Sequence, residues 1–188
     1  KNVLIFSRKY RLIKLKIFIF IFIYFYSLNL YSTNVVVINI DQIINNNQSY
    51  RLIIKEIEKS QNKYLEILKQ KESDLEQVLN NIENEKLFLN EEEINNKIVK
   101  YNQNVSEFTI LVENFNNHYQ KEISAIRSKI LDKIIVLLEM HAKNNKIDLV
   151  LDSTSYLIAS NAINITDIIN SELDDTKLKL NYKEFNEN

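Results

Sequence analysis

Few side chains in this sequence have the type and spacing that catalysis or metal binding requires. Among the 188 residues there are two histidines, His118 and His141, and there is no cysteine and no glycine. Without cysteine, thiolate zinc sites, disulfides and thiol nucleophiles are excluded. Without glycine, the phosphate-binding loops that need close approach of the backbone are excluded as well.

The acidic residues offer two candidate groups, and neither has the partners that chemistry needs. Asp148 and Asp152 share one face of a predicted strand, but no base, nucleophile or metal ligand accompanies them. Glu91–Glu93 follow Asn90, which is the pattern of a helix start, where carboxylates favour the positive end of the helix dipole. His141 falls in the last turn of the same predicted helix. We therefore expect no catalytic residue, no metal site and no cofactor, and thus no enzyme.

The first 32 residues read as a targeting segment. Residues 1–16 hold six basic side chains and no acidic one, and an apolar run at 17–26 and Ser32 follow. This pattern predicts a secretory signal peptide at 1–32 that is cleaved after export, the alternative being a retained membrane anchor. The chain has 24 basic and 25 acidic residues, so removal of the segment leaves 18 against 25 and a net charge of about −7. An acidic protein of this kind is not expected to bind nucleic acid.

Apolar periodicity predicts two long helices in the middle of the chain. Steps of three and four separate the apolar residues across 50–88 and again across 91–143, which is a coiled-coil pattern. Asn90 followed by Glu93 fits a capping box, so we expect a hairpin at 50–143 with its tip near 88–91, the alternative being one helix that continues through this point. In such an antiparallel hairpin, facing residues have numbers that sum to about 180. The predicted seam comprises Tyr64, Leu68, Leu75, Ile82, Ile98, Val105, Val112 and Phe115.

Short β-branched runs flank the hairpin and predict a small body. Residues 33–49 should hold a strand at Val35–Ile40 and a short helix capped by Asp41. Residues 144–173 should hold strands at Ile147–Asp152 and Tyr156–Ala159 and a helix capped by Thr166. The polar tail, 174–188, is expected to be disordered. The fold class is therefore mainly α with a small β body, whose short strands need partners from other chains.

The order of these segments is similar to that of a known family. The chain from about Val35 to Leu173 resembles the Skp/OmpH periplasmic chaperones. The most specific matches are Val35–Ile40, Leu89–Glu93 at the tip, Ile147–Asp152, and Asn164–Asp167 before the last helix.

This resemblance implies a homotrimer in which the strands form a small β-barrel and the hairpins enclose unfolded outer-membrane β-barrel proteins in the periplasm without ATP. The implied trimer strands contain Val35, Val36, Val37, Ile38, Ile40, Leu149, Val150, Leu151, Leu157 and Ile158. Residues 80–93 hold five Glu and one Lys, so the basic lipopolysaccharide site of some relatives is not expected.

Apolar residues outside the seam are candidates for contact with an unfolded protein. The client-contact residues are Ile67, Phe88, Val99 and Ile110, although simple broadening of the hairpin packing would also explain them. The function expected is an ATP-independent holdase, a chaperone that keeps its client from aggregating. The alternative is a membrane-anchored coiled-coil protein that tethers or supports the cell envelope.

Overall fold

The computed structural model describes residues 32–187, so nearly all of the predicted signal peptide lies outside the described residues. The chain divides into two compact units after Asn34, and every described helix and strand belongs to the second unit. The elements in chain order are β1 (Val35–Ile38), α2 (Ile40–Asn46), α3 (Gln48–Glu85), α4 (Glu91–Asn145), β2 (Leu149–Asp152), the 3₁₀ turns η1 (Ser153–Ser155) and η2 (Asn161–Ile163), and α5 (Thr166–Asp174). The prediction of a mainly helical fold with one long helix pair is confirmed.

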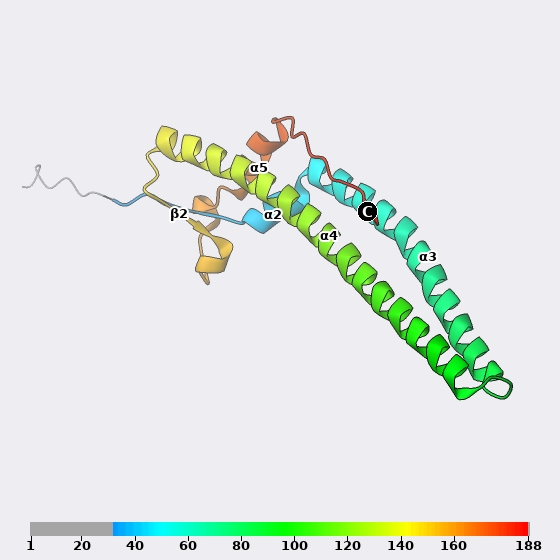
Figure 1. The fold of residues 1–188 in the computed structure, drawn as a ribbon. Coiled ribbons are helices and arrows are strands. Elements are labelled where there is room, and N and C mark those ends of the chain that lie inside the picture. Colours follow the sequence, from blue (N-terminus) through cyan, green and yellow to red (C-terminus); the bar gives the residue numbers. More distant parts are fainter. Residues whose placement is uncertain (1–31, 188) are drawn as a thin grey trace, which may run out of the picture. The chain divides into compact units, whose positions relative to one another are not determined.

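Helices α3 and α4 form an antiparallel hairpin that turns at residues 86–90, called the tip below (Figure 1). The capping box predicted at the turn is present. The Asn90 side chain accepts a hydrogen bond from the Glu93 N–H (2.9 Å), and the Glu93 carboxylate accepts one from the Asn90 N–H (3.2 Å). Both bonds satisfy amides that a helix start otherwise leaves unpaired, so they fix the point where α4 begins.

Contacts between the two helices follow the spacing of the apolar stripe. The Tyr64 ring stacks on Phe115 with 5.2 Å between centroids, and Ser60 Oγ lies 2.7 Å from the Tyr119 hydroxyl. Of the predicted seam, Leu68, Ile82 and Phe115 are buried, Tyr64, Leu75, Val105 and Val112 are half-buried, and Ile98 is exposed. The predicted seam therefore lies along the contact between the two helices as far as Ile82, with Ile98 at its exposed margin.

The body contains a two-stranded parallel sheet in which β1 pairs with β2, from Val35 opposite Leu149 to Ile38 opposite Asp152. The other edge of β1 is bridged at Val37 by Asn164, and the Ile165 N–H donates to the Val37 carbonyl (2.9 Å). Helices α2, α4 and α5 pack together around this sheet. The core they share consists mainly of Val36, Ile38, Ile43, Ile44, Ile53, Ile57, Ile126, Ile130, Ile134, Leu137, Ile165, Ile169 and Leu173.

Two strand predictions are wrong. Residues 156–159 form no strand, and Leu157 and Ile158 are 100% and 92% exposed. The chain leaves the sheet after β2 because Asp152 accepts hydrogen bonds from Thr154 and starts η1, and Asn164 takes the free place beside β1. Ile40 is not part of β1 but is the first residue of α2.

The predicted helix caps lie one or two residues from the observed ones. Asn39, not Asp41, caps α2, since its side chain accepts from the Gln42 N–H (2.9 Å). At α5 the N-cap position is Ile165 and no side chain caps the helix; the Asn164 side chain accepts from the Thr166 N–H (2.9 Å), and Thr166 is the first helical residue rather than the cap. The left-handed residue that ends α4 is Lys146 (φ 52°).

The C-terminal tail is ordered, contrary to the prediction of disorder. Residues 176–187, called the tail below, leave α5 and run along the hairpin from the body towards the tip (Figure 1). Their side chains Leu178, Leu180, Tyr182 and Phe185 pack against the main core. These four apolar side chains bury enough surface to hold a segment that is otherwise polar.

Candidate functional site

The hairpin carries apolar side chains that the fold leaves in solvent. All four predicted client-contact residues are exposed: Ile67 by 47%, Phe88 by 86%, Val99 by 59% and Ile110 by 55%. They come from both helices and the tip, and they are accompanied by Leu65, Val78, Leu79, Leu87 and Ile98. Single exposed apolar residues are ordinary, but a series along one hairpin is typical of a surface that binds another chain.

The tip presents the two most exposed of these side chains, Leu87 (84%) and Phe88 (86%). The turn is tight, because the Phe88 and Leu89 N–H groups both donate to the Glu85 carbonyl (2.9 and 3.1 Å). Glu85 also forms an ion pair with Lys97 across the hairpin. A phenylalanine in this position contributes almost no burial to folding and is accessible to another molecule.

A groove lies between α3 and α4 in the half of the hairpin nearer the tip. Its volume is about 310 Å³. Lys71 and Phe108 both line it, as the pairing of residue numbers predicts. The remaining lining residues are Asp74, Leu75, Val78, Asn104, Glu107 and Leu111. The groove is thus an apolar strip bordered by charged side chains.

In the half of the hairpin nearer the body, the tail covers the space between the helices. The Phe185 ring meets the rings of Tyr64 and Phe115 edge-on, with centroids 4.9 and 5.6 Å away, and Phe115 also meets Tyr119. Tyr64, Phe115, Tyr119 and Phe185 are called the aromatic cluster below. The Tyr182 hydroxyl donates to the Glu56 carbonyl of α3 (3.2 Å). This arrangement was not predicted from the sequence, although the alternation of Leu178, Leu180 and Tyr182 was a possible signal for it.

Polar contacts at the end of the tail shift two pKa values. Burial raises the pKa of the Tyr64 hydroxyl, and the hydrogen bond it donates to Glu187 (2.6 Å) raises it further. That same bond, together with the ion pair to Lys71 (3.1 Å), lowers the pKa of Glu187. The carboxylate is therefore charged at neutral pH and links the tail to α3.

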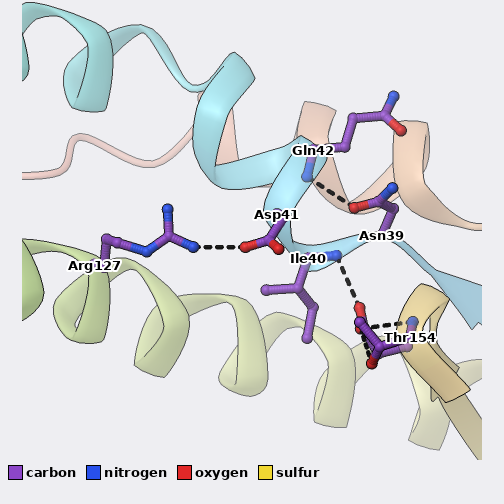
Figure 2. Close-up of polar contacts among 7 residues, drawn as sticks. Asn39, Ile40, Asp41, Gln42, Arg127 and Thr154 are labelled. Carbon is purple, nitrogen blue, oxygen red and sulfur yellow. Dashed lines mark hydrogen bonds and ion pairs between the residues drawn. The ribbon is translucent and has the colours of Figure 1, made fainter.

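A polar junction joins the sheet to the hairpin (Figure 2). Arg127 of α4 pairs with Asp41 of α2 (2.5 Å), and the Ile40 N–H donates to the Asp152 carboxylate (3.1 Å). Burial alone would raise the pKa of Asp152, but the hydrogen bonds from Ile40 and Thr154 bring it below its usual value. Asp152 is thus a structural residue that ends β2 and anchors the start of α2.

The predicted trimer residues fall into two groups. Val36, Val37, Ile38 and Ile40 are buried or half-buried inside a single chain, as are Val35, Val150 and Leu151. Leu149, Leu157 and Ile158 are exposed. Nearby on α4 and α5, Ile135, Val136, Met140 and Ile168 are exposed too. The body therefore has apolar surface left over, including the outer edge of β2.

The histidines and the acidic residues of the described range, 32–187, form no metal centre. No group of three or more His, Cys, Asp or Glu side chains is arranged to hold a metal ion in this range. His141 pairs with Glu172 (3.3 Å), and His118 lies against the tail, so both histidines have structural contacts. In the same part of the chain, none of the helices is both long enough and apolar enough to cross a membrane.

Comparisons with known proteins bear on this architecture. The family model described as outer membrane protein (OmpH-like) matches residues 34–173. A comparison with curated proteins found no significant match. Among solved structures, a candidate outer membrane chaperone (OmpH-like) from Caulobacter crescentus CB15 is similar, with a TM-score of 0.63 at 12% identity, covering 84% of this chain and 94% of that chain. Because the family model covers most of the chain, the resemblance predicted from the sequence is confirmed: the chain belongs to the OmpH-like (Skp) family of outer membrane protein chaperones, whose members are not enzymes.

Proposed function

We propose that the protein is an ATP-independent holdase that binds unfolded outer-membrane β-barrel proteins in the periplasm and keeps them from aggregating. The observation that carries this proposal is the series of exposed apolar side chains along the hairpin, with Phe88 at the tip. Many separate apolar contacts bind weakly one by one and strongly together, which suits the capture and later release of an unfolded chain.

The holding mechanism is sequestration. An unfolded β-barrel protein exposes strand edges that pair with those of other chains and start aggregation. Contact with Ile67, Val99 and Ile110 would keep such segments apart from those of other chains. No nucleotide is needed when binding and release depend only on weak contacts.

The working form is a homotrimer in this proposal. Two observations support self-association: a sheet of two strands is too small to be stable on its own, and Leu149, Leu157 and Ile158 remain exposed around it. Pairing of the free edge of β2 with another copy would cover that edge and those side chains together.

The test uses the mature protein and an unfolded outer-membrane β-barrel protein diluted from urea without ATP. Light scattering should show that the client stays soluble. Replacing Ile67, Phe88, Val99 and Ile110 together by Ser should weaken this protection while helix content stays the same. Each side chain is worth at most about 1.5–3 kcal/mol of burial and less in a mobile complex, so single changes should have small effects.

A matched control replaces four exposed polar residues of the same two helices by Ser, namely Asn62, Gln77, Asn96 and Asn114. The control should protect the client as well as the wild type does. If the apolar variant and the control behave alike, the exposed apolar series is not the binding surface. If the wild type gives no protection at equimolar amounts, the anchored coiled-coil function becomes the better proposal.

A further inference from the structure

The tail lies on the hairpin as an extended strand would. From Thr176 to Tyr182, half-buried and exposed residues alternate, and Leu178, Leu180 and Tyr182 all face the helices. A period of two is the mark of an extended chain with one face packed. The tail also lies beyond residues 34–173, the part of the chain that the family model matches.

Side chains of α4 hold the backbone of the tail. The Lys183 N–H donates to the Glu122 carboxylate (3.0 Å), and the Lys183 carbonyl lies 2.8 Å from His118 Nε2. Further along, the Phe185 N–H donates to the Tyr119 hydroxyl (3.4 Å). Every residue type except proline offers the same two backbone groups. An extended segment of a different sequence would therefore make the same contacts with α4.

The aromatic cluster provides one pocket for a side chain. Phe185 enters it against Tyr64 and Phe115, and an open depression of about 230 Å³ lies beside its ring, lined by Tyr119 and Ile67 among others. Ile67 is itself a predicted client-contact residue and is 47% exposed. The site of the Phe185 ring is therefore continuous with the exposed apolar series.

The end of the tail is held by an exposed ion pair. Its last ion pair, Lys71 with Glu187, is more than 40% exposed on both sides, and pairs of this kind stabilise little. Ordering a terminal segment of about 12 residues has a large entropic cost that opposes its binding. Another chain with the same pattern is then able to take its place.

We propose that a second groove, formed under the tail by Tyr64 of α3 and His118, Tyr119 and Glu122 of α4, binds an extended client segment. The tail occupies this second groove as an intramolecular competitor. The segment that fits has alternating apolar residues and an aromatic ring. Strands of membrane β-barrels have this alternation and carry aromatic residues near their ends. The inference rests on the proposed holdase function and adds to it the site and the pattern that is recognised.

A single fluorescent residue tests whether a client displaces the tail. The sequence has no tryptophan, so Phe185→Trp in the full mature protein places one reporter in the aromatic cluster. The client is an unfolded eight-stranded outer-membrane β-barrel protein in which every tryptophan is replaced by phenylalanine. As client is added, the emission of the introduced tryptophan should move towards that of tryptophan in water, and its quenching by acrylamide should increase.

Affinity provides the second measurement. If the tail fills the groove in about nine of ten molecules, Phe185→Ser should tighten client binding about tenfold, because the competitor is lost. The matched control is Lys179→Ser, which changes an exposed residue of the tail and should leave affinity unchanged. In the Phe185→Ser background, His118→Ala with Glu122→Ala should weaken client binding, since these side chains then hold the client backbone. Circular dichroism checks that helix content is equal in all variants.

The outcomes separate this inference from the holdase proposal. If the client is protected but the emission of the reporter and the affinity of Phe185→Ser do not change, the tail is only structural and the inference is wrong, while the holdase function stands. If neither the wild type nor Phe185→Ser protects the client, the holdase proposal fails and this inference fails with it. Protection by Phe185→Ser that exceeds that of the wild type supports both.

Discussion

Two phenylalanines of the hairpin should differ sharply in how much their truncation lowers the free energy of unfolding. Phe115 is 3% exposed and contacts the rings of Tyr64 and Tyr119, with centroids 5.2 Å away in both cases. Phe88 is 86% exposed. Replacing a buried phenylalanine by alanine removes its burial and leaves a cavity, which costs about 3–5 kcal/mol. Replacing one in solvent changes stability by less than about 0.5 kcal/mol.

Urea unfolding followed by circular dichroism at fixed protein concentration measures the contrast. With an m-value near 3 kcal/mol per M, Phe115→Ala should lower the midpoint by about 1–2 M, and Phe88→Ala by less than about 0.2 M. Client protection by Phe88→Ala should change little, because Phe88 is one of many weak contacts. Equal midpoint shifts for the two variants, or a shift below about 0.3 M for Phe115→Ala, would refute the account of hairpin packing.

Three further predictions concern the turn, the junction and the body. Asn90→Ala should remove one arm of the capping box and destabilise the start of α4 by about 1 kcal/mol, seen as faster hydrogen exchange of the amides next to the tip. The pKa of Asp152 is lowered in the folded state, so this carboxylate stabilises the protein above about pH 4 and loses that effect as the pH falls through the folded pKa. The difference in unfolding free energy between the wild type and Asp152→Asn should therefore shrink from pH 7 to pH 3. Leu149→Asp should abolish self-association in light scattering, because this exposed residue of the edge strand would bring an unpaired charge into the proposed interface; a variant that keeps the wild-type mass would exclude β2 from it.

The hairpin could be predicted because its signals are local and repeated. Tyr64 faces Phe115 because a period of three and four residues and one turn fix every pair along the two helices. The turn itself was encoded by Asn90 and Glu93, whose side chains cap the helix three residues apart. Neither inference needs knowledge of distant parts of the chain.

The errors arise where a distant segment decides the outcome. Leu157 and Ile158 belong to an apolar run that is typical of a strand, but in the folded chain Asn164, not this run, pairs with the second edge of β1. Phe185 lies in a polar stretch typical of disorder, and only the groove built by residues more than 60 positions away makes it a packing residue. The caps were misplaced by one or two residues because Asn, Asp and Thr stand close together at each helix start, and each of them is able to cap.

The parallel pairing of β1 with β2 has a consequence for how the chain assembles in time. The Ile40 N–H and the Asp152 carboxylate that it contacts are separated by 112 residues. Pairing of the two strands therefore has to wait until the long segment between them has folded. The hairpin forms from near neighbours around residue 90 and brings the two strands together as it closes. Until then, three consecutive valines of β1 remain an open strand edge, the same hazard that unfolded β-barrel proteins present. Slow closure of the hairpin should therefore increase self-aggregation of newly made chains, even where the folded protein is stable.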